Sequence, residues 1–178
     1  MTAERWLVFF HVTCAIGMVL ALMLEWLSVR GAARAESVEQ ARTLARLSRA
    51  LMPVGLPSTL GSLGTGIALG QLLGAWELGW VRIAVPCLVA IAVAGALVGS
   101  RRSKAFAALK DGGTLEELRR ALGHPALDLS LRFRTALLAA LLFEMTVRPD
   151  GPLAWVILGA AATVAGASMV AGRVARMT

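Results

Sequence analysis

Long apolar stretches alternate with short polar segments along the chain. Five stretches are almost entirely apolar, at residues 6–29, 51–73, 79–99, 129–147 and 152–172. Each is close to the roughly 20 residues that an α-helix needs to cross a bilayer core about 30 Å thick. The pattern predicts an all-α protein, a polytopic transmembrane helical bundle with five spans, which forms one integral membrane domain over residues 1–178.

The fourth stretch has the weakest apolar character of the five. It contains Arg132, Arg134 and Glu144. Both arginines lie near one end, from which long side chains reach the headgroup region. A bundle of four spans, with this stretch re-entrant or interfacial, is therefore an alternative to five.

Composition supports the same class. Hydrophobic residues make up 57% of the chain and the mean hydropathy is +0.71, whereas a soluble domain contains roughly 45–50% apolar residues. The net charge of +7 comes from basic residues in short segments beside the stretches. This placement favours contact with anionic cytoplasmic lipids and argues against nucleic acid as a partner.

Basic residues are distributed unevenly between successive segments. If the N-terminus lies outside, 15 of the 18 Lys and Arg residues fall on the cytoplasmic side, as the positive-inside rule requires. Four of the five tryptophans then lie at outer ends of spans, where indole rings prefer to sit. We expect a protein of a bacterial inner (plasma) membrane with its N-terminus outside and its C-terminus in the cytoplasm.

Two polar segments have the pattern of short amphipathic cytoplasmic helices. Ser37 and Gln40 have capping-box spacing before apolar residues at helical intervals, and this helix should lead into the second span. Thr114 and Glu117 form a second capping box, and Gly123 marks the end of that helix.

Glycines in the second and third stretches repeat at intervals of four. Gly66, Gly70 and Gly74 form one series, and Gly95 and Gly99 form another. Such small-xxx-small steps let helices approach closely. We expect them to mediate packing within the protein, with other membrane subunits or in a homo-oligomer.

One face of the first stretch carries side chains that can bind metals. His11, Cys14 and Met18 recur at intervals of three and four, followed by Glu25. Imidazole, thiol and thioether together suit Cu(I), and His11 with Met18 also suits haem b. The alternative is that Cys14 and Met18 only fill space in the core.

Ionisable residues within apolar stretches are further candidates, because they are costly in a membrane. Arg82 and Glu144 come to the same outer level as His11, so we expect a polar intramembrane cluster in which Arg82 and Glu144 neutralise each other. Glu25 lies toward the inner end, where Arg134 or Arg30 would be its structural partner.

Catalytic signatures are absent from the sequence. It has no CxxC pair, no Walker or Rossmann glycine pattern, no HExxH, and two histidines, which are too few for a multi-histidine metal cage. We therefore expect no enzymatic activity, and the catalytic residues, if any, are unknown.

Three short segments resemble one group of membrane proteins. Residues 6–11 (WLVFFH), 47–53 (LSRALMP) and 144–150 (EMTVRPD) are similar to elements of the copper-resistance-D-like superfamily, which includes the haem-dependent protoporphyrinogen oxidases and uncharacterised families. The resemblance implies that His11 matches a first-helix histidine associated with haem. Arg82 stands in a segment where the oxidases have a histidine, so the resemblance implies an uncharacterised branch.

Three functions are consistent with the sequence. The first is an accessory or transport-type inner-membrane protein with a haem or copper site near the outer leaflet. The second is a haem-dependent membrane oxidoreductase with His11 as axial ligand. The third is a purely structural subunit of a larger membrane complex.

Overall fold

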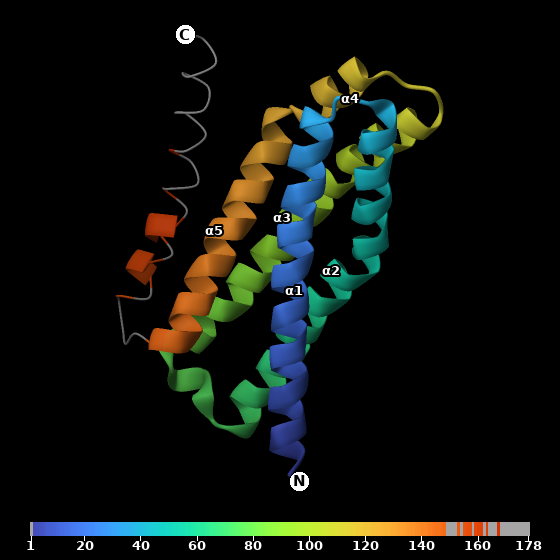
Figure 1. Ribbon diagram of the computed structural model, residues 1–178. Coiled ribbons are helices and arrows are strands. Elements are labelled where there is room, and N and C mark those ends of the chain that lie inside the picture. Colours follow the sequence, from blue (N-terminus) through green and yellow to red (C-terminus); the bar gives the residue numbers. More distant parts are fainter. Residues whose placement is uncertain are drawn as a thin grey trace.

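The protein is an antiparallel bundle of long helices (Figure 1). The computed structural model describes residues 2–148 together with residues 153, 155–157, 159–161, 163 and 167. Within residues 2–148 the helices are α1 (Ala3–Arg34), α2 (Val38–Leu72), α3 (Gly79–Lys110), α4 (Leu115–Leu122) and α5 (Pro125–Val147), with a 3₁₀ turn η1 (Ala75–Glu77) before α3. No strand occurs among the described residues, so the predicted all-α class is confirmed.

Two of these helices, α1 and α3, are long and apolar enough to cross a membrane. This is fewer than the five spans that the sequence predicts. Glycine, serine, threonine and proline lower the hydropathy of α2, and the charges of Arg132, Arg134 and Glu144 interrupt α5. The predicted fifth span, residues 152–172, falls largely outside the described residues.

The ends of the helices follow the local sequence signals. Ser37 Oγ accepts a hydrogen bond from the backbone N–H of Gln40 at 3.2 Å, which caps α2. Thr114 and Glu117 form a complete capping box at the start of α4, and Gly123 ends that helix. The predicted continuation of the amphipathic helix into the second apolar stretch is also confirmed, because α2 runs unbroken through Pro53 and Pro57.

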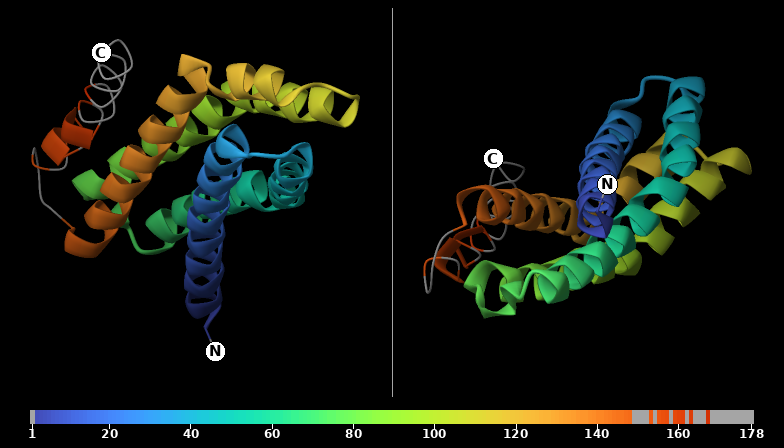
Figure 2. Two further views of the ribbon diagram at one scale, coloured as in Figure 1. Left: turned by 45° about the horizontal axis from the view of Figure 1, so that its top comes forward. Right: turned by 90° about the horizontal axis from the view of Figure 1, so that it is seen from below.

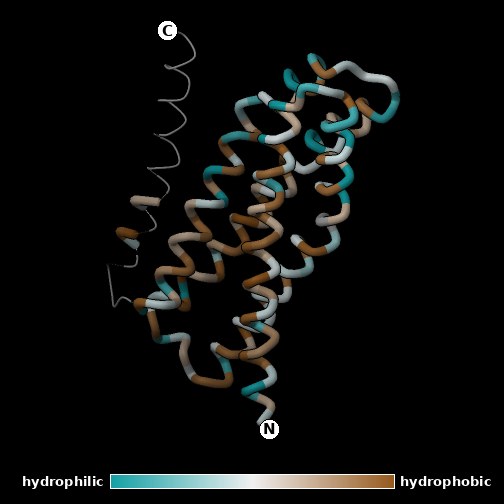
Figure 3. Tube along the Cα trace, viewed as in Figure 1, coloured by the Kyte–Doolittle hydropathy of each residue, from teal (hydrophilic) through white to brown (hydrophobic). Residues whose placement is uncertain are grey.

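Polar and apolar residues separate along the bundle. Figure 3 shows hydrophilic residues concentrated at the end that carries α4 and the connection between α1 and α2, whereas the rest of the helices is mainly hydrophobic. Arg119 of α4 donates a hydrogen bond to the carbonyl of Ala35 at 2.9 Å, which ties α4 to that connection. We call this the arginine-rich end of the bundle.

The helices associate as two pairs. The most extensive contact is between α1 and α2, and the next is between α3 and α5, whereas α1 touches α5 only locally. Figure 2 shows α3 and α5 side by side in two further views. Ser130 Oγ of α5 donates to the carbonyl of Ala94 at 2.9 Å and adds a polar contact within the second pair.

Glycines bring α1 and α2 close together. A methyl group on Gly61 would lie 2.5 Å from Cys14 Sγ, and one on Gly17 would lie 2.4 Å from Ser58 Oγ. Of the predicted glycine series, Gly66 lies against the His11 ring, and Gly70 lies against Trp76. The predicted close approach is therefore present between α2 and α1 at Gly66, whereas a methyl group on Gly74 or Gly99 would meet no atom within 4 Å.

Candidate functional site

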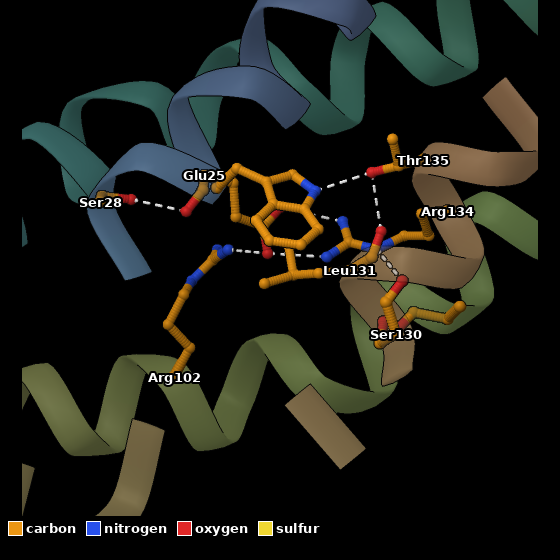
Figure 4. Close-up of polar contacts among 9 residues, drawn as sticks. Glu25, Ser28, Arg102, Ser130, Leu131, Arg134 and Thr135 are labelled. Carbon is orange, nitrogen blue, oxygen red and sulfur yellow. Dashed lines mark hydrogen bonds and ion pairs between the residues drawn. The ribbon is translucent and has the colours of Figure 1, made fainter. Parts of the chain in front are cut away.

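Three charged side chains from three helices meet near the arginine-rich end. Arg134 of α5 donates from both terminal nitrogens to Glu25 of α1, at 2.9 Å and 2.7 Å. Arg102 of α3 forms an ion pair with the same carboxylate through its Nη1 atom. Figure 4 shows both guanidinium groups directed at Glu25 from different helices. One carboxylate thus links the two helix pairs.

The cluster is largely shielded from solvent and is not neutral. The exposed fractions of the Arg134, Arg102 and Glu25 side chains are 8%, 11% and 14%. Two arginines and one glutamate leave one positive charge in excess. Buried charges are stable only when they are paired and hydrogen-bonded, and the bidentate geometry satisfies this requirement for Arg134 and Glu25. The excess charge therefore belongs to the Arg102 side of the cluster.

Local sequence makes room for this arrangement. A methyl group on Gly95 of α3 would lie 3.2 Å from Arg134 Nη1, so the absence of a side chain there admits the guanidinium group. Arg134 Nε also donates to the carbonyl of Ser130 one turn earlier, at 3.4 Å. The guanidinium group is thereby held toward α1 and α3.

Further polar contacts join α1 to α5 beside the cluster. The indole N–H of Trp26 donates to Thr135 Oγ1 at 2.7 Å. Arg30, whose guanidinium carbon lies 4.8 Å from the centre of the Trp26 ring, forms an ion pair with Asp128. Since α1 touches α5 only locally, these polar groups account for much of the contact between the two helices.

A cavity of about 350 Å³ adjoins the cluster. Its volume lies within the range of roughly 300–1,000 Å³ that is common for small-molecule sites. Glu25, Arg102 and Arg134 form its charged end. Hydroxyl and apolar side chains complete the wall: Ser48, Thr59, Ser100, Ser103, Met18, Leu22, Leu56 and Ile91. The cavity can therefore accept a molecule with an anionic group and an apolar part.

The predicted ligand stripe on α1 lies mainly against α2. His11 Nδ1 is 3.0 Å from Thr65 Oγ1, Cys14 Sγ packs beside Gly61, and Met18 is buried and lines the cavity. Among the described residues, no group of three or more His, Cys, Asp and Glu side chains is arranged to hold a metal ion. A haem or copper site at His11, Cys14 and Met18 stays a prediction.

The predicted pairing of Arg82 with Glu144 is not the arrangement in the structure. Arg82 pairs with Glu77 at 2.7 Å and donates to the carbonyl of Trp76 at 2.6 Å, and both charged side chains are exposed. Glu144 is 1% exposed, and both of its carboxyl oxygens lack a hydrogen-bond partner among the described residues. Glu77 is five residues before Arg82 and outside the apolar stretches, so the positions of ionisable residues within those stretches do not indicate this partner.

The prediction for Glu25 is confirmed for Arg134 but not for Arg30. Arg30 pairs with Asp128 instead. The ion pair between Arg102 and Glu25 was not predicted, because Arg102 was counted among the basic cytoplasmic residues that follow the third apolar stretch. The helical extension of that stretch through Arg102 is the signal that places it beside the cluster, since α3 continues without a break to Lys110.

Fold and site together define a class: an all-helical protein with two helices able to cross a membrane and a buried charge cluster beside a cavity. Comparison with known proteins finds no matching family model, no matching curated protein and no matching solved structure. The resemblance to the copper-resistance-D-like superfamily therefore rests on the sequence segments alone.

Proposed function

We propose that this chain is a polytopic membrane protein of accessory or transport type that binds an anionic amphiphile in the cavity beside Glu25, Arg102 and Arg134. The observation that carries the proposal is the excess positive charge of a shielded cluster at one end of an otherwise mainly apolar cavity. An anionic headgroup would neutralise this charge, and an alkyl chain would cover the apolar wall.

The outward-facing surface of the helices supports residence in a membrane. Only 17% of the most apolar window of α1 and 33% of that of α3 are buried inside the protein. A core helix of a soluble protein would bury most of such a window. Large apolar side chains that face outward include Phe9, Phe10, Ile16, Leu20, Leu27, Val93 and Leu97.

In this proposal α2 and α5 also cross the membrane, and residues 152–172 supply a fifth span. The length of α5, 23 residues, is sufficient. The charges within it do not prevent insertion, because Arg134 is paired with Glu25 and lies inside the bundle. The N-terminus is outside, and the arginine-rich end faces the cytoplasm.

Topology is tested with single cysteines in a background that lacks Cys14 and Cys87. An impermeant thiol reagent applied to intact cells should label Asp150→Cys. It should label Asp111→Cys, which lies at the end of α3, only after the membrane is opened. The reverse result would contradict the orientation. Labelling of both positions or of neither in intact cells would place them on the same side of the membrane and would contradict a crossing by α5.

Binding is tested with Arg102→Gln. This change removes the excess charge but leaves the bidentate pair of Arg134 and Glu25 intact, so the variant should fold. Arg101→Gln is a matched control, because Arg101 is adjacent in sequence, exposed, and contacts the ring of His124 instead of the cluster.

The probe is dodecyl phosphate, added to the protein in a neutral detergent. At about 100 times its Kd, a ligand stabilises the folded state by about 2.7 kcal/mol, which corresponds to a rise in melting temperature of about 5–10 °C. We expect this rise for the wild type and Arg101→Gln and its loss in Arg102→Gln. Inorganic phosphate should act more weakly. An equal rise with dodecanol, or an undiminished rise in Arg102→Gln, would contradict an anion site.

A further inference from the structure

Glu144 is a buried carboxyl group without a partner. It lies in the last turns of α5, at the end of the bundle opposite the charge cluster. Its residue exposure is 1%, and neither oxygen has a hydrogen-bond donor among the described residues. The only other buried side-chain polar atom of this kind in the described part of the chain is Ser62 Oγ.

The charged groups near this end of α5 are engaged elsewhere. Arg148, which follows the last residue of α5 in a left-handed backbone conformation, has its guanidinium carbon 5.8 Å from the centre of the Trp80 ring of α3. Arg82 of α3 is held by Glu77. Cys87, a buried residue of α3, is close enough to interact electrostatically with Glu144, but a thiol supplies no positive charge. No cation among the described residues therefore compensates a negative charge on Glu144.

The ionised and protonated forms of Glu144 differ in the free-energy cost of burial. An ionised carboxylate without a counter-ion or donors in an apolar interior is far more costly than a neutral polar group. A protonated carboxyl leaves one O–H donor and two weakly accepting oxygens without partners, which costs about 1–3 kcal/mol. The neutral acid is the form that this environment favours.

We propose that Glu144 is a proton-binding site, which holds a proton in this conformation and releases it when the ends of α3 and α5 separate. The ionised carboxylate would then have a partner within reach, because the backbone N–H of Arg148 already donates to the Glu144 carbonyl at 2.8 Å. Arg148 follows Glu144 by four residues, and moving its side chain from Trp80 toward Glu144 would bring a cation to the ionised carboxylate. The site is separate from the proposed anion site and does not depend on it.

The first test is labelling with dicyclohexylcarbodiimide, an apolar reagent that adds to protonated carboxyl groups. The carboxyl O–H adds across one C=N bond, and the O-acylisourea then rearranges to a stable N-acylurea, so the residue gains the full mass of the reagent and nothing leaves. An exposed glutamic acid with an ordinary pKa of about 4.3 is protonated in fewer than about 1% of molecules at neutral pH. Mass spectrometry at neutral pH should therefore find Glu144 labelled at least about tenfold more than Glu77.

Glu144→Gln and Glu77→Gln form a matched pair of variants. Both replace a carboxylate by an amide of the same shape, but Glu77 is exposed and paired with Arg82. Only Glu144→Gln should abolish the label, and its melting temperature should stay at the wild-type value, because a neutral group replaces a neutral group. A large rise in the melting temperature of Glu144→Gln would show that an uncompensated ionised carboxylate had been removed, and a large fall would show that a paired one had been lost; either result would overturn the proposal.

Infrared difference spectroscopy gives a second readout that needs no reagent. The wild type at neutral pH should show the carbonyl stretch of a protonated carboxyl group, and this band should be missing from Glu144→Gln and present in Glu77→Gln. Absence of the band from the wild type, or its persistence in Glu144→Gln, would overturn the assignment. Loss of dodecyl phosphate binding in Arg102→Gln concerns a different residue, so the two proposals fail independently.

Discussion

Helix α1 has two unlike contact surfaces. Toward α2 it presents small or uncharged side chains, and Cys14 and Gly17 lie against Gly61 and Ser58 at very short range. Toward α3 and α5 it presents Glu25, which meets two arginines. In a membrane, apolar surfaces gain little from leaving lipid, so association depends on close packing and on polar contacts. The two surfaces of α1 use these two means separately.

The two contact surfaces of α1 should therefore respond differently to charge-changing substitutions and to added ions. Close packing of uncharged groups is insensitive to charge and to ions. The charge cluster can be changed by removing one charge, and an added anion can compete for Arg102. The α1–α2 pair should therefore act as a fixed unit, and the contact between the two helix pairs should be the adjustable one.

Glu25→Ala should have the largest effect on stability of the variants proposed for these two surfaces. It leaves Arg102 and Arg134 shielded without a carboxylate, and loss of one partner from a buried ion pair costs about 3–5 kcal/mol. Thermal unfolding in a neutral detergent should show a correspondingly large loss of stability. As a control, Glu39→Ala removes an exposed carboxylate whose pair with Arg46 spans 3.9 Å, and it should change stability by no more than about 1 kcal/mol.

Gly61→Ala tests the packed surface of α1. The added methyl group would lie 2.5 Å from Cys14 Sγ, and overpacking of this kind costs about 1–3 kcal/mol. Cys14→Ala should rescue it, because the methyl group is 3.5 Å from Cys14 Cβ, an ordinary contact distance. A double-mutant cycle measures the rescue. If the effects of the two changes simply add, Cys14 is not what limits the approach of the helices.

The hydrogen bond between Trp26 and Thr135 allows the contribution of one uncharged polar contact between α1 and α5 to be measured. Trp26→Phe removes the indole donor that lies 2.7 Å from Thr135 Oγ1, with an expected cost of about 1 kcal/mol. Thr135→Val removes the acceptor, and the double variant should lose little more than either single one. Full additivity in unfolding measurements would mean that the two side chains do not stabilise each other.

His11→Ala distinguishes packing from cofactor binding on the same helix. Loss of the contact with Thr65 at 3.0 Å should cost about 0.6 kcal/mol, the average for hydrogen bonds in a membrane protein. If His11 also ligates haem, the purified wild type has a Soret band that the variant lacks. A copper site would instead appear in metal analysis. A colourless, metal-free wild type would contradict both forms of the cofactor prediction.

The smallest effect is expected away from both surfaces, at the start of α4. Hydrogen bonding to the backbone and hydroxyl of Thr114 holds the pKa of Glu117 below its ordinary value. The stabilisation is therefore present above the ordinary pKa and is lost as the pH falls through the lower value in the folded protein. Melting temperatures of the wild type and Glu117→Gln should converge at acid pH. A constant difference at every pH would contradict a role for the Glu117 charge.

Sequence patterns correctly predicted the helix ends and helix continuity, which depend on residues close together in the chain. The caps at Ser37 and Thr114, the end of α4 at Gly123 and the continuity of α2 follow from short-range rules. The contact of Glu25 with Arg134 was predicted from similar depth in the membrane. Depth is one coordinate of three, however, and it does not fix how each helix rotates about its axis.

The unpredicted rotation of each helix about its axis explains why some partners of charged side chains were predicted wrongly. Arg82 and Glu144 were placed at one level, but Arg82 turns to Glu77 and Glu144 lies within the packed interior. Arg102 follows the third apolar stretch and was counted only among the cytoplasmic basic residues, but its side chain pairs with Glu25. Long flexible arginine side chains reach partners several residues away in depth, so assigning each charge to the level of its own Cα atom was insufficient.

The separation of Glu25 from Arg134 by 109 residues has a consequence for synthesis of the protein on the ribosome. Chains emerge from the N-terminus at about 5–20 residues per second, so α1 and α2 can pair several seconds before α5 exists. When α1 and α2 first pair, Glu25 has neither of its two arginines. The newly made hairpin therefore carries an uncompensated acid until α3 supplies Arg102 and, later, α5 supplies Arg134.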